Sequence, residues 1–139
     1  MTGMIHAYQY KVVTLFDCMQ NPATTSWLEQ FGLALPDHVP PGRYPTPLEI
    51  RGVMEGLAGL RTTYLVGKYT WQVTLRHRKD VSWAVLAVEG FSGNNEEPHS
   101  FYFTGGWDEV ILQVTAALAK HCGPLVLLHE SGARPLIVW

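Results

Sequence analysis

The sequence predicts a single α+β domain, with a mainly antiparallel sheet and about three helices packed on it. In the middle of the chain, segments with the period-2 alternation of strands follow one another over short links, a pattern typical of antiparallel pairing. Segments with the helical spacing of apolar residues stand before and after them. A chain of 139 residues has the length of one domain, so we assign residues 1–139 to a single globular unit.

The first elements are a strand and a short helix. Residues 7–16 (AYQYKVVTLF) are rich in aromatic and β-branched residues, which favour a strand. Ser26 and Glu29 then have the spacing of a capping box, and Trp27 and Leu28 belong to a short apolar stripe. These signals predict a helix that begins near Ser26.

A second helix is predicted after a proline-rich segment. Residues 36–47 hold five prolines, which exclude a helix or a central strand and indicate an ordered, extended connection. Thr46 has the position of an N-cap, Pro47 is suited to the first helical position, and Glu49 completes a capping box.

The same helix carries an unusual number of glycines. They are Gly52, Gly56 and Gly59, and each costs a helix about 1 kcal/mol relative to alanine. We interpret them as positions where the helix packs closely on a sheet or on the first predicted helix. The alternative is a backbone surface left bare for a ligand.

The middle of the chain predicts a hairpin. Residues 69–77 alternate apolar and polar side chains, whereas residues 81–89 are apolar on both faces, as in a central strand or one whose second face meets a partner. Residues 76–80 (RHRKD) form the tip. We therefore expect Trp71 and Trp83 to be mostly buried.

The last third predicts a strand, a helix and two short strands. Residues 99–104 place two phenylalanines on one face, and two glycines then precede the clearest helix of the chain. Its predicted apolar stripe consists of Trp107, Val110, Ile111, Val114 and Leu118. The Gly-Pro pair at 123–124 ends the helix, and the segments 124–129 and 135–139 read as strands around a glycine-containing loop.

Composition and charge exclude several classes of function. The net charge of −2 lacks the cationic excess that neutralises phosphates, so we expect no nucleic-acid partner. No apolar run approaches the roughly 18 to 20 residues of a membrane span, and the first residues lack the features of a secretory signal. We expect a soluble, cytoplasmic protein without a membrane partner.

The stretch AKHCGPLVLLHE gathers residue types that bind metals or form nucleophiles. They are His121, Cys122, His129 and Glu130. The first two fall in the last turn of the predicted helix and the others follow a whole strand, so we interpret the group as a helix end and expect no metal and no cofactor. The sequence leaves open whether Cys18 joins them in space.

No catalytic residue is predicted. The stretch FTGGWDE resembles a turn that holds a phosphate, but it lacks the P-loop lysine, and its acidic pair would repel an anion. The sequence also lacks G-x-S-x-G, H-E-x-x-H and C-x-x-C. These absences favour a protein that is not an enzyme, although distant residues can also assemble an acid–base pair.

Two polar segments are candidates for contact with another protein, because neither supplies core residues nor caps a predicted helix. The first is the basic hairpin tip and the second is a polar loop. Their residues are Arg76, Arg78 and Lys79 in the tip, and Asn94, Asn95, Glu96 and Glu97 in the loop.

The C-terminal third resembles a known class of binding proteins. Residues 101–138 lead from a strand into an amphipathic helix, a Gly-Pro pair and a final short hairpin, as in the closing segment of some small bacterial immunity proteins. Those proteins neutralise toxins of polymorphic or contact-dependent systems. The resemblance covers about a quarter of the chain and implies a non-enzymatic binder that blocks a toxin, with no catalytic residue to carry over.

We therefore predict a small soluble protein-binding module, with immunity-type inhibition of a partner toxin as the specific version. The alternative is a small enzyme or small-molecule-binding domain whose pocket lies between the sheet and the glycine-rich helix. A third hypothesis is a homo-oligomer that assembles through a sheet face or edge.

Overall fold

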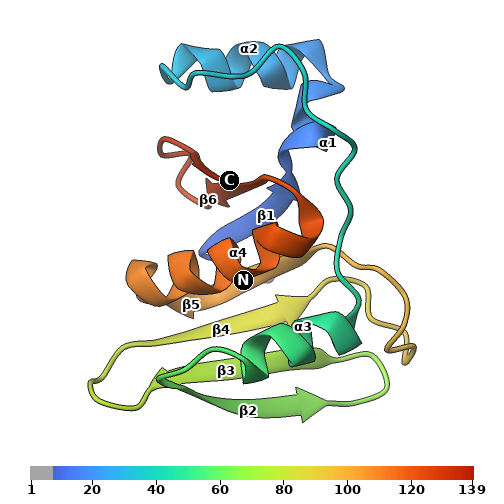
Figure 1. Cartoon of the computed structure of the whole chain (residues 1–139), viewed down its shortest axis with the longest axis vertical. Coiled ribbons are helices and arrows are strands. Elements are labelled where there is room, and N and C mark those ends of the chain that lie inside the picture. Colours follow the sequence, from blue (N-terminus) through green and yellow to red (C-terminus); the bar gives the residue numbers. More distant parts are fainter. Residues whose placement is uncertain (1–7) are drawn as a thin grey trace, which may run out of the picture.

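Residues 8–139 fold around one antiparallel sheet of seven strands, in the order β2-β3-β4-β5-β1-β6-β7. The computed structural model describes residues 8–139 (Figure 1). The strands are β1 (Tyr10–Thr14), β2 (Leu60–Val66), β3 (Trp71–His77), β4 (Trp83–Val88), β5 (Phe101–Gly106), β6 (Leu125–His129) and β7 (Leu136–Val138). The predicted α+β class with a mainly antiparallel sheet is confirmed.

In the described part of the chain, four helices accompany the sheet, close to the approximate three that we predicted. They are α1 (Leu15–Met19), α2 (Pro22–Gln30), α3 (Pro47–Glu55) and α4 (Asp108–Cys122). Figure 1 shows α3 and α4 in front of the sheet, while α2 lies beyond its β6 and β7 end. None of the helices in the described part of the chain has the length and apolar character needed to cross a membrane.

The helices bury two separate apolar clusters on opposite faces of the sheet. The larger cluster joins α3 and α4 to β1–β6 and includes Leu125 and Leu127. The smaller cluster joins α1 and α2 to Val126, the residue between those two leucines. Because successive side chains of a strand point to opposite faces, α1 and α2 cover the second face near β6.

No helix of the described residues covers the second face of the sheet over β2, β3 and the start of β4. We call this surface the open face. Its polar side chains alternate with buried ones, as the sequence predicts for β3. The side chains that define it are Arg61, Thr63, Leu65, Gln72, Thr74, Arg76, Trp83 and Val85.

The first strand is shorter than predicted. Strand β1 ends at Thr14, whose side-chain oxygen accepts a hydrogen bond from the Asp17 backbone N–H at 3.1 Å and so caps α1. Leu15 and Phe16, which we assigned to the strand, are the first residues of α1. Residue 7, the predicted start of this strand, lies outside the described residues.

Helix α2, the first helix that we predicted, starts earlier than expected. Its N-cap is Asn21, which accepts hydrogen bonds from the Ala23 and Thr24 backbone N–H groups at 2.9 and 3.3 Å, and Pro22 is the first helical residue. Ser26 and Glu29 therefore lie inside α2 and do not form a capping box. An asparagine followed by proline is the stronger start signal, because proline is pre-set for the first turn.

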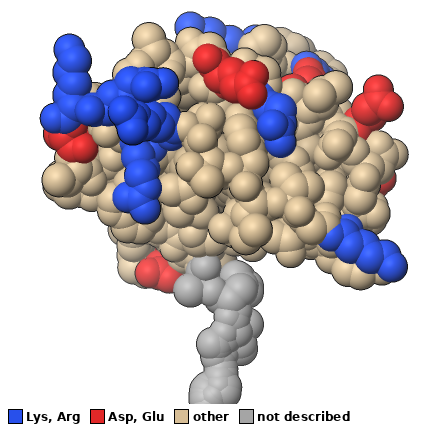
Figure 2. Space-filling view, turned by 90° about the horizontal axis from the view of Figure 1, so that it is seen from below, with Lys and Arg blue, Asp and Glu red and all other residues tan. Residues whose placement is uncertain are grey.

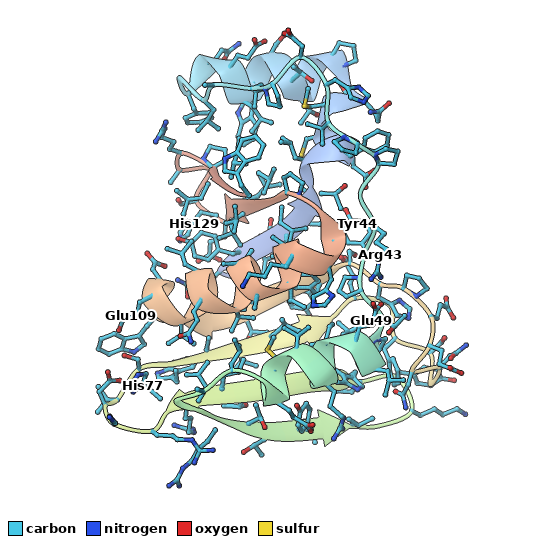
Figure 3. The ribbon with its side chains drawn as sticks, in the orientation of Figure 1. Arg43, Tyr44, Glu49, His77, Glu109 and His129 are labelled. Atoms are coloured by element: carbon cyan, nitrogen blue, oxygen red, sulfur yellow. The ribbon has the colours of Figure 1, made fainter. Side chains whose placement is uncertain are left out.

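Helix α3 begins as predicted. Thr46 caps Glu49 and the Glu49 carboxylate accepts the Thr46 backbone N–H, both at 3.1 Å, so the capping box is confirmed. Arg43 donates to the same carboxylate, with Nη1 2.8 Å from Oε1. Figure 3 shows Arg43 and Glu49 where the proline-rich segment meets α3.

The proline-rich segment is extended, as predicted, and attaches to the rest of the fold. The Arg43 backbone N–H donates to the Cys122 carbonyl at 3.1 Å, and the Tyr44 hydroxyl donates to Asp17 at 3.1 Å. A Cβ at Gly42 would lie 2.9 Å from the same Cys122 carbonyl oxygen, so glycine permits this close approach. The segment therefore links α1, α3 and the end of α4.

We expect Glu49→Gln to lower the free energy of unfolding by about 0.5 to 1 kcal/mol at neutral pH, because it removes an exposed bidentate ion pair. The Arg43 guanidinium lowers the pKa of Glu49 to about 2 from an ordinary value of 4.5. A depressed pKa stabilises the fold above pH 4.5 and loses this effect as the pH falls towards 2. Urea unfolding of both proteins across this range should show the difference vanish in acid. A difference that stays constant would contradict the assignment.

Candidate protein-binding surface

The tip between β3 and β4 is an ordered turn. Asp80 accepts the Ser82 backbone N–H at 2.7 Å, and the His77 ring nitrogen Nδ1 accepts the Lys79 backbone N–H at 3.1 Å. The hydrogen bonds from Ser82 lower the pKa of Asp80. Ser82 also donates its hydroxyl to Glu109 at 2.7 Å, which joins the tip to the first turn of α4. His77 and Glu109 mark this end of the molecule in Figure 3.

The basic residues of the tip belong to a larger group than we predicted. Arg61 of β2 is the cross-strand partner of Arg76, so the tip residues Arg76, Arg78 and Lys79 gain a fourth cation. We call these four residues the basic end. All are exposed, and within residues 8–139 none of them forms an ion pair. Figure 2 shows a gathering of Lys and Arg at one side of the molecule.

Trp83, which lies beside the basic end, is more exposed than predicted. Trp71 is 2% exposed, as expected, but Trp83 is 36% exposed and therefore only partly buried. The reason is its position on the open face, where it neighbours Arg76 across the strands and lies against Gly105. The prediction was therefore wrong for Trp83 alone, because no helix within residues 8–139 covers the start of β4 on this face.

A second exposed tryptophan, Trp107, lies close to Trp83 and is 45% exposed. We placed it on the buried stripe of its helix, but it is the N-cap residue of α4, outside the regular turns. The other four stripe residues, Val110, Ile111, Val114 and Leu118, are at most 1% exposed, as predicted. The Trp107 backbone N–H donates to the Trp83 carbonyl at 2.8 Å, so the two residues are neighbours. We call Trp83 and Trp107 the tryptophan pair.

The polar loop lies at the other end of the sheet from the basic end. The tip precedes β4 and the loop follows it, so the structure does not bring the two predicted segments together. The Asn95 carbonyl accepts the Leu48 backbone N–H in the first turn of α3 at 3.1 Å. Our premise that this loop caps no helix was therefore wrong. Asn94, Glu96 and Glu97 are exposed, and their role in binding stays a prediction.

The histidines and cysteines are spread over different surroundings. Cys18 belongs to the smaller apolar cluster and Cys122 to the larger one, so the sheet separates them. Burial raises the pKa of each thiol to about 11, which disfavours the reactive thiolate. His121 is exposed at the end of α4, whereas His129 packs edge-on against Tyr10, with ring centroids 5.0 Å apart. Residues 8–139 hold no group of three or more metal-binding side chains.

We expect the purified protein to carry no stoichiometric zinc, because a structural zinc ion requires about four converging ligands. Elemental analysis after dialysis is the measurement. A content near one zinc per chain that disappears in Cys122→Ser would contradict this prediction.

In the glycine turn before α4, the backbone N–H groups already donate hydrogen bonds within the protein. The Gly106 backbone N–H donates to the Gln9 side chain at 3.0 Å, and the next N–H along the chain is also bonded. Asp108 and Glu109 line the shallow hollow beside this turn, together with Gln9 and Trp107. Two carboxylates and two occupied N–H groups disfavour phosphate binding, as the sequence indicated.

Of the three glycines predicted in this helix, only Gly52 lies in α3, Gly56 is its C-cap residue and Gly59 lies beyond it. Neither Gly52 nor Gly56 serves close packing. A Cβ at Gly52 would meet no atom within 4 Å, and one at Gly56 would contact only its own helix. Helix α3 packs on the sheet through the fully buried Ile50 and Met54. The two glycines line a groove of about 380 Å³ between α3 and α4, with Lys120 and His121 at its far side. The groove thus lies outside the helix layer and not between α3 and the sheet.

Comparison of the chain with protein-family models, with curated proteins and with solved structures gave no match. The candidate surface is thus defined by its own geometry. Sequence reasoning found three of its cations but missed Arg61, Trp83 and Trp107. Arg61 lies beside the tip because it is paired with Arg76 in the β2–β3 hairpin. Only a correct prediction of this strand pairing could have identified Arg61 from the sequence.

Proposed function

We propose that this protein is a binding module for another protein, and that the basic end and the tryptophan pair form its contact surface. The observation that carries the proposal is the combination of two exposed indoles with three exposed arginines and a lysine at one end of the sheet. Tryptophan and arginine are the residues most enriched at the energetic centres of protein interfaces.

The charge of this surface selects the chemistry of the partner. The four cations of the basic end have no ion-pair partner within residues 8–139, so an acidic surface could approach without breaking internal pairs. Val81, which is 75% exposed, adds an apolar contact at the tip. We therefore propose an acidic protein surface as the partner, with an apolar centre that receives the indoles.

The specific version is immunity-type inhibition, in which the partner is a toxin. It is supported by the resemblance of residues 101–138 to the closing segment of immunity proteins, which includes Trp107 and the helix that follows it. A toxin partner would lose its activity on mixing with an equal amount of this protein. A partner recovered from the native cell that is not a toxin, and is not inhibited, would contradict this version while leaving the binding module intact.

The test begins with recovery of a partner by pull-down from the native cell. We then expect Arg78→Glu with Lys79→Glu to slow association by about tenfold, and by more at low salt than at high salt, because complementary charge steers the encounter. Stability should change by less than about 0.5 kcal/mol, since both side chains are exposed. Surface plasmon resonance at two salt concentrations measures the rate.

The matched control is Lys68→Glu with Lys120→Glu. It makes the same change in net charge at two exposed lysines outside the basic end and should slow association much less. Equal slowing by both double variants would show that only the net charge matters. Unaltered association in the first variant would exclude the basic end.

A small-molecule-binding domain or small enzyme is the second candidate, and the groove between α3 and α4 is the observation that favours it. Val53 and Leu57 give its lining apolar side chains, and Glu49, Lys120 and His121 supply charged or polar groups. Failure to recover any protein partner, together with turnover or stabilisation by a small molecule, would favour this candidate. Gly52→Leu should then block the groove without disturbing the basic end.

A further inference from the structure

Strand β2 forms an open edge of the sheet. It stands at one end of the sheet order, is seven residues long and, within residues 8–139, pairs with β3 alone. Figure 1 shows no element beyond it. An edge of this kind presents a row of backbone N–H and C=O groups that another strand can bind.

Two hydrogen bonds establish which backbone groups of β2 face outward. The Gly67 N–H donates to the Thr70 carbonyl, and the Arg78 N–H donates to the Gly59 carbonyl, both at 2.8 Å. Bonding positions alternate along an antiparallel pair, so the odd-numbered residues between 59 and 67 bond to β3. The backbone groups of the even-numbered residues point away from the sheet. These residues are Leu60, Thr62, Tyr64 and Val66.

Apart from the single charge of Arg61, this edge lacks the features that usually protect an exposed strand. It contains no proline and no lysine, and its pairing with β3 runs without a bulge. Leu65 and Val66 are 58% and 46% exposed. Figure 2 views the molecule from the side of β2, and the middle of this surface is free of charged residues. The opposite edge, β7, is only three residues long and offers little to bind.

We propose that a second copy of this chain pairs with β2 through this edge, antiparallel and centred on Thr63. In this register Leu60 lies opposite Val66 of the second copy, and Thr62 lies opposite Tyr64. These are the residues whose backbone groups face outward, so every outward group at the four positions finds a partner. The two sheets then join into one continuous sheet.

The side chains of β2 are complementary to themselves in this register. Arg61 is the single charged residue of the strand, and it lies opposite Leu65 of the second copy, so no like charges face each other. On the helix side, the pairs join apolar residues or threonine with tyrosine. A register centred one position away leaves an end residue unpaired. Self-complementarity about a twofold axis favours a second copy over an unrelated peptide strand.

The first test is a cross-link at the proposed axis. Directly opposite residues at a non-hydrogen-bonded position have their Cα atoms about 4.5 Å apart, which is within reach of a disulfide. Thr63→Cys should therefore give a covalent dimer on mild oxidation, seen on a non-reducing gel. The native cysteines should give little cross-linking of their own, because Cys18 and Cys122 are buried and burial raises the pKa of each thiol to about 11.

Matched controls come from the same strand. Arg61→Cys and Leu65→Cys alone should stay monomeric on the gel, because each residue lies about 13 Å from its own copy along the strand. The two changes together should cross-link again, since residues 61 and 65 face each other. Cross-linking that is equal at all three single positions, or absent at Thr63, would overturn the proposed register.

The second test measures the mass of the unmodified protein by light scattering. We expect twice the chain mass of 15.6 kDa at high concentration. Thr62→Pro removes an outward N–H without breaking a bond to β3 and should give a monomer with an unchanged circular dichroism spectrum. Thr62→Val keeps the N–H and should stay dimeric. A wild-type protein that stays monomeric near 100 μM, roughly the range of weak association, would overturn the proposal. A monomer whose β2 edge instead binds a strand of another protein would also overturn it.

Discussion

Replacing Gly106 by alanine is expected to lower the free energy of unfolding by about 3 to 5 kcal/mol, the largest effect of any single methyl group that we predict here. Gly106 has a φ of +144°, a conformation that residues with a Cβ rarely adopt. An added Cβ would lie 2.5 Å from Ala84 Cα and 2.7 Å from the Trp83 carbonyl oxygen. Both obstacles belong to the backbone region of β4 and cannot rotate away. Urea unfolding measures the change.

Gly52→Ala is the matched control for this substitution. It adds the same methyl group at a helical glycine whose Cβ position is empty out to 4 Å, so we expect the protein to gain about 0.5 to 1 kcal/mol of stability. Similar effects of the two substitutions would mean that the close approach of β4 and β5 at Gly106 is not what requires glycine there.

Trp83→Ala is expected to weaken binding of the protein partner by about 30-fold, or about 2 kcal/mol, because an indole beside arginines is typical of an interface hot spot. The side chain is 36% exposed and pairs across the strands with Arg76, in the middle of the proposed contact surface. Titration calorimetry with the recovered partner gives the affinity. Thermal unfolding of the variant must accompany it, since part of the indole packs on Gly105.

Trp27→Ala provides the control for this prediction. Trp27 has the same exposed fraction of 36% but lies on α2, which covers the other end of the sheet. We expect this variant to bind the partner as the wild type does. A loss of affinity in Trp27→Ala that equals the loss in Trp83→Ala would place the interface elsewhere or reduce both effects to general destabilisation.

Features that depend on a few neighbouring residues could be predicted from the sequence. The capping box of Thr46 and Glu49 is such a feature, because its two hydrogen bonds join residues three positions apart. The end of α4 at Gly123 is another, since a positive φ of 83° suits glycine and the following proline cannot continue the helix. Phe101 and Phe103 were correctly placed on one face of their strand by alternation alone, and the structure buries both.

Features that depend on distant residues were predicted less well. Whether Trp83 is covered depends on whether a helix lies over that face of β4, and the strand itself carries apolar residues on both faces. Asn95 contributes to α3 through a carbonyl that meets Leu48, 47 positions earlier in the chain. A loop with a polar composition gives no sign of such a contact, because any residue type has a backbone carbonyl.

The sequence by itself determined the fold class, most helices and strands, and the cations of the hairpin tip, because hydrogen bonds between near neighbours and the period of apolar residues are local properties. Only the tertiary structure decided that β1 lies between β5 and β6, that α1 and α2 cover one end of the second face, and that β2 is an open edge. These outcomes follow from which distant apolar surfaces bury one another. That choice leaves the basic end, the tryptophan pair and the outward backbone of β2 exposed to partners.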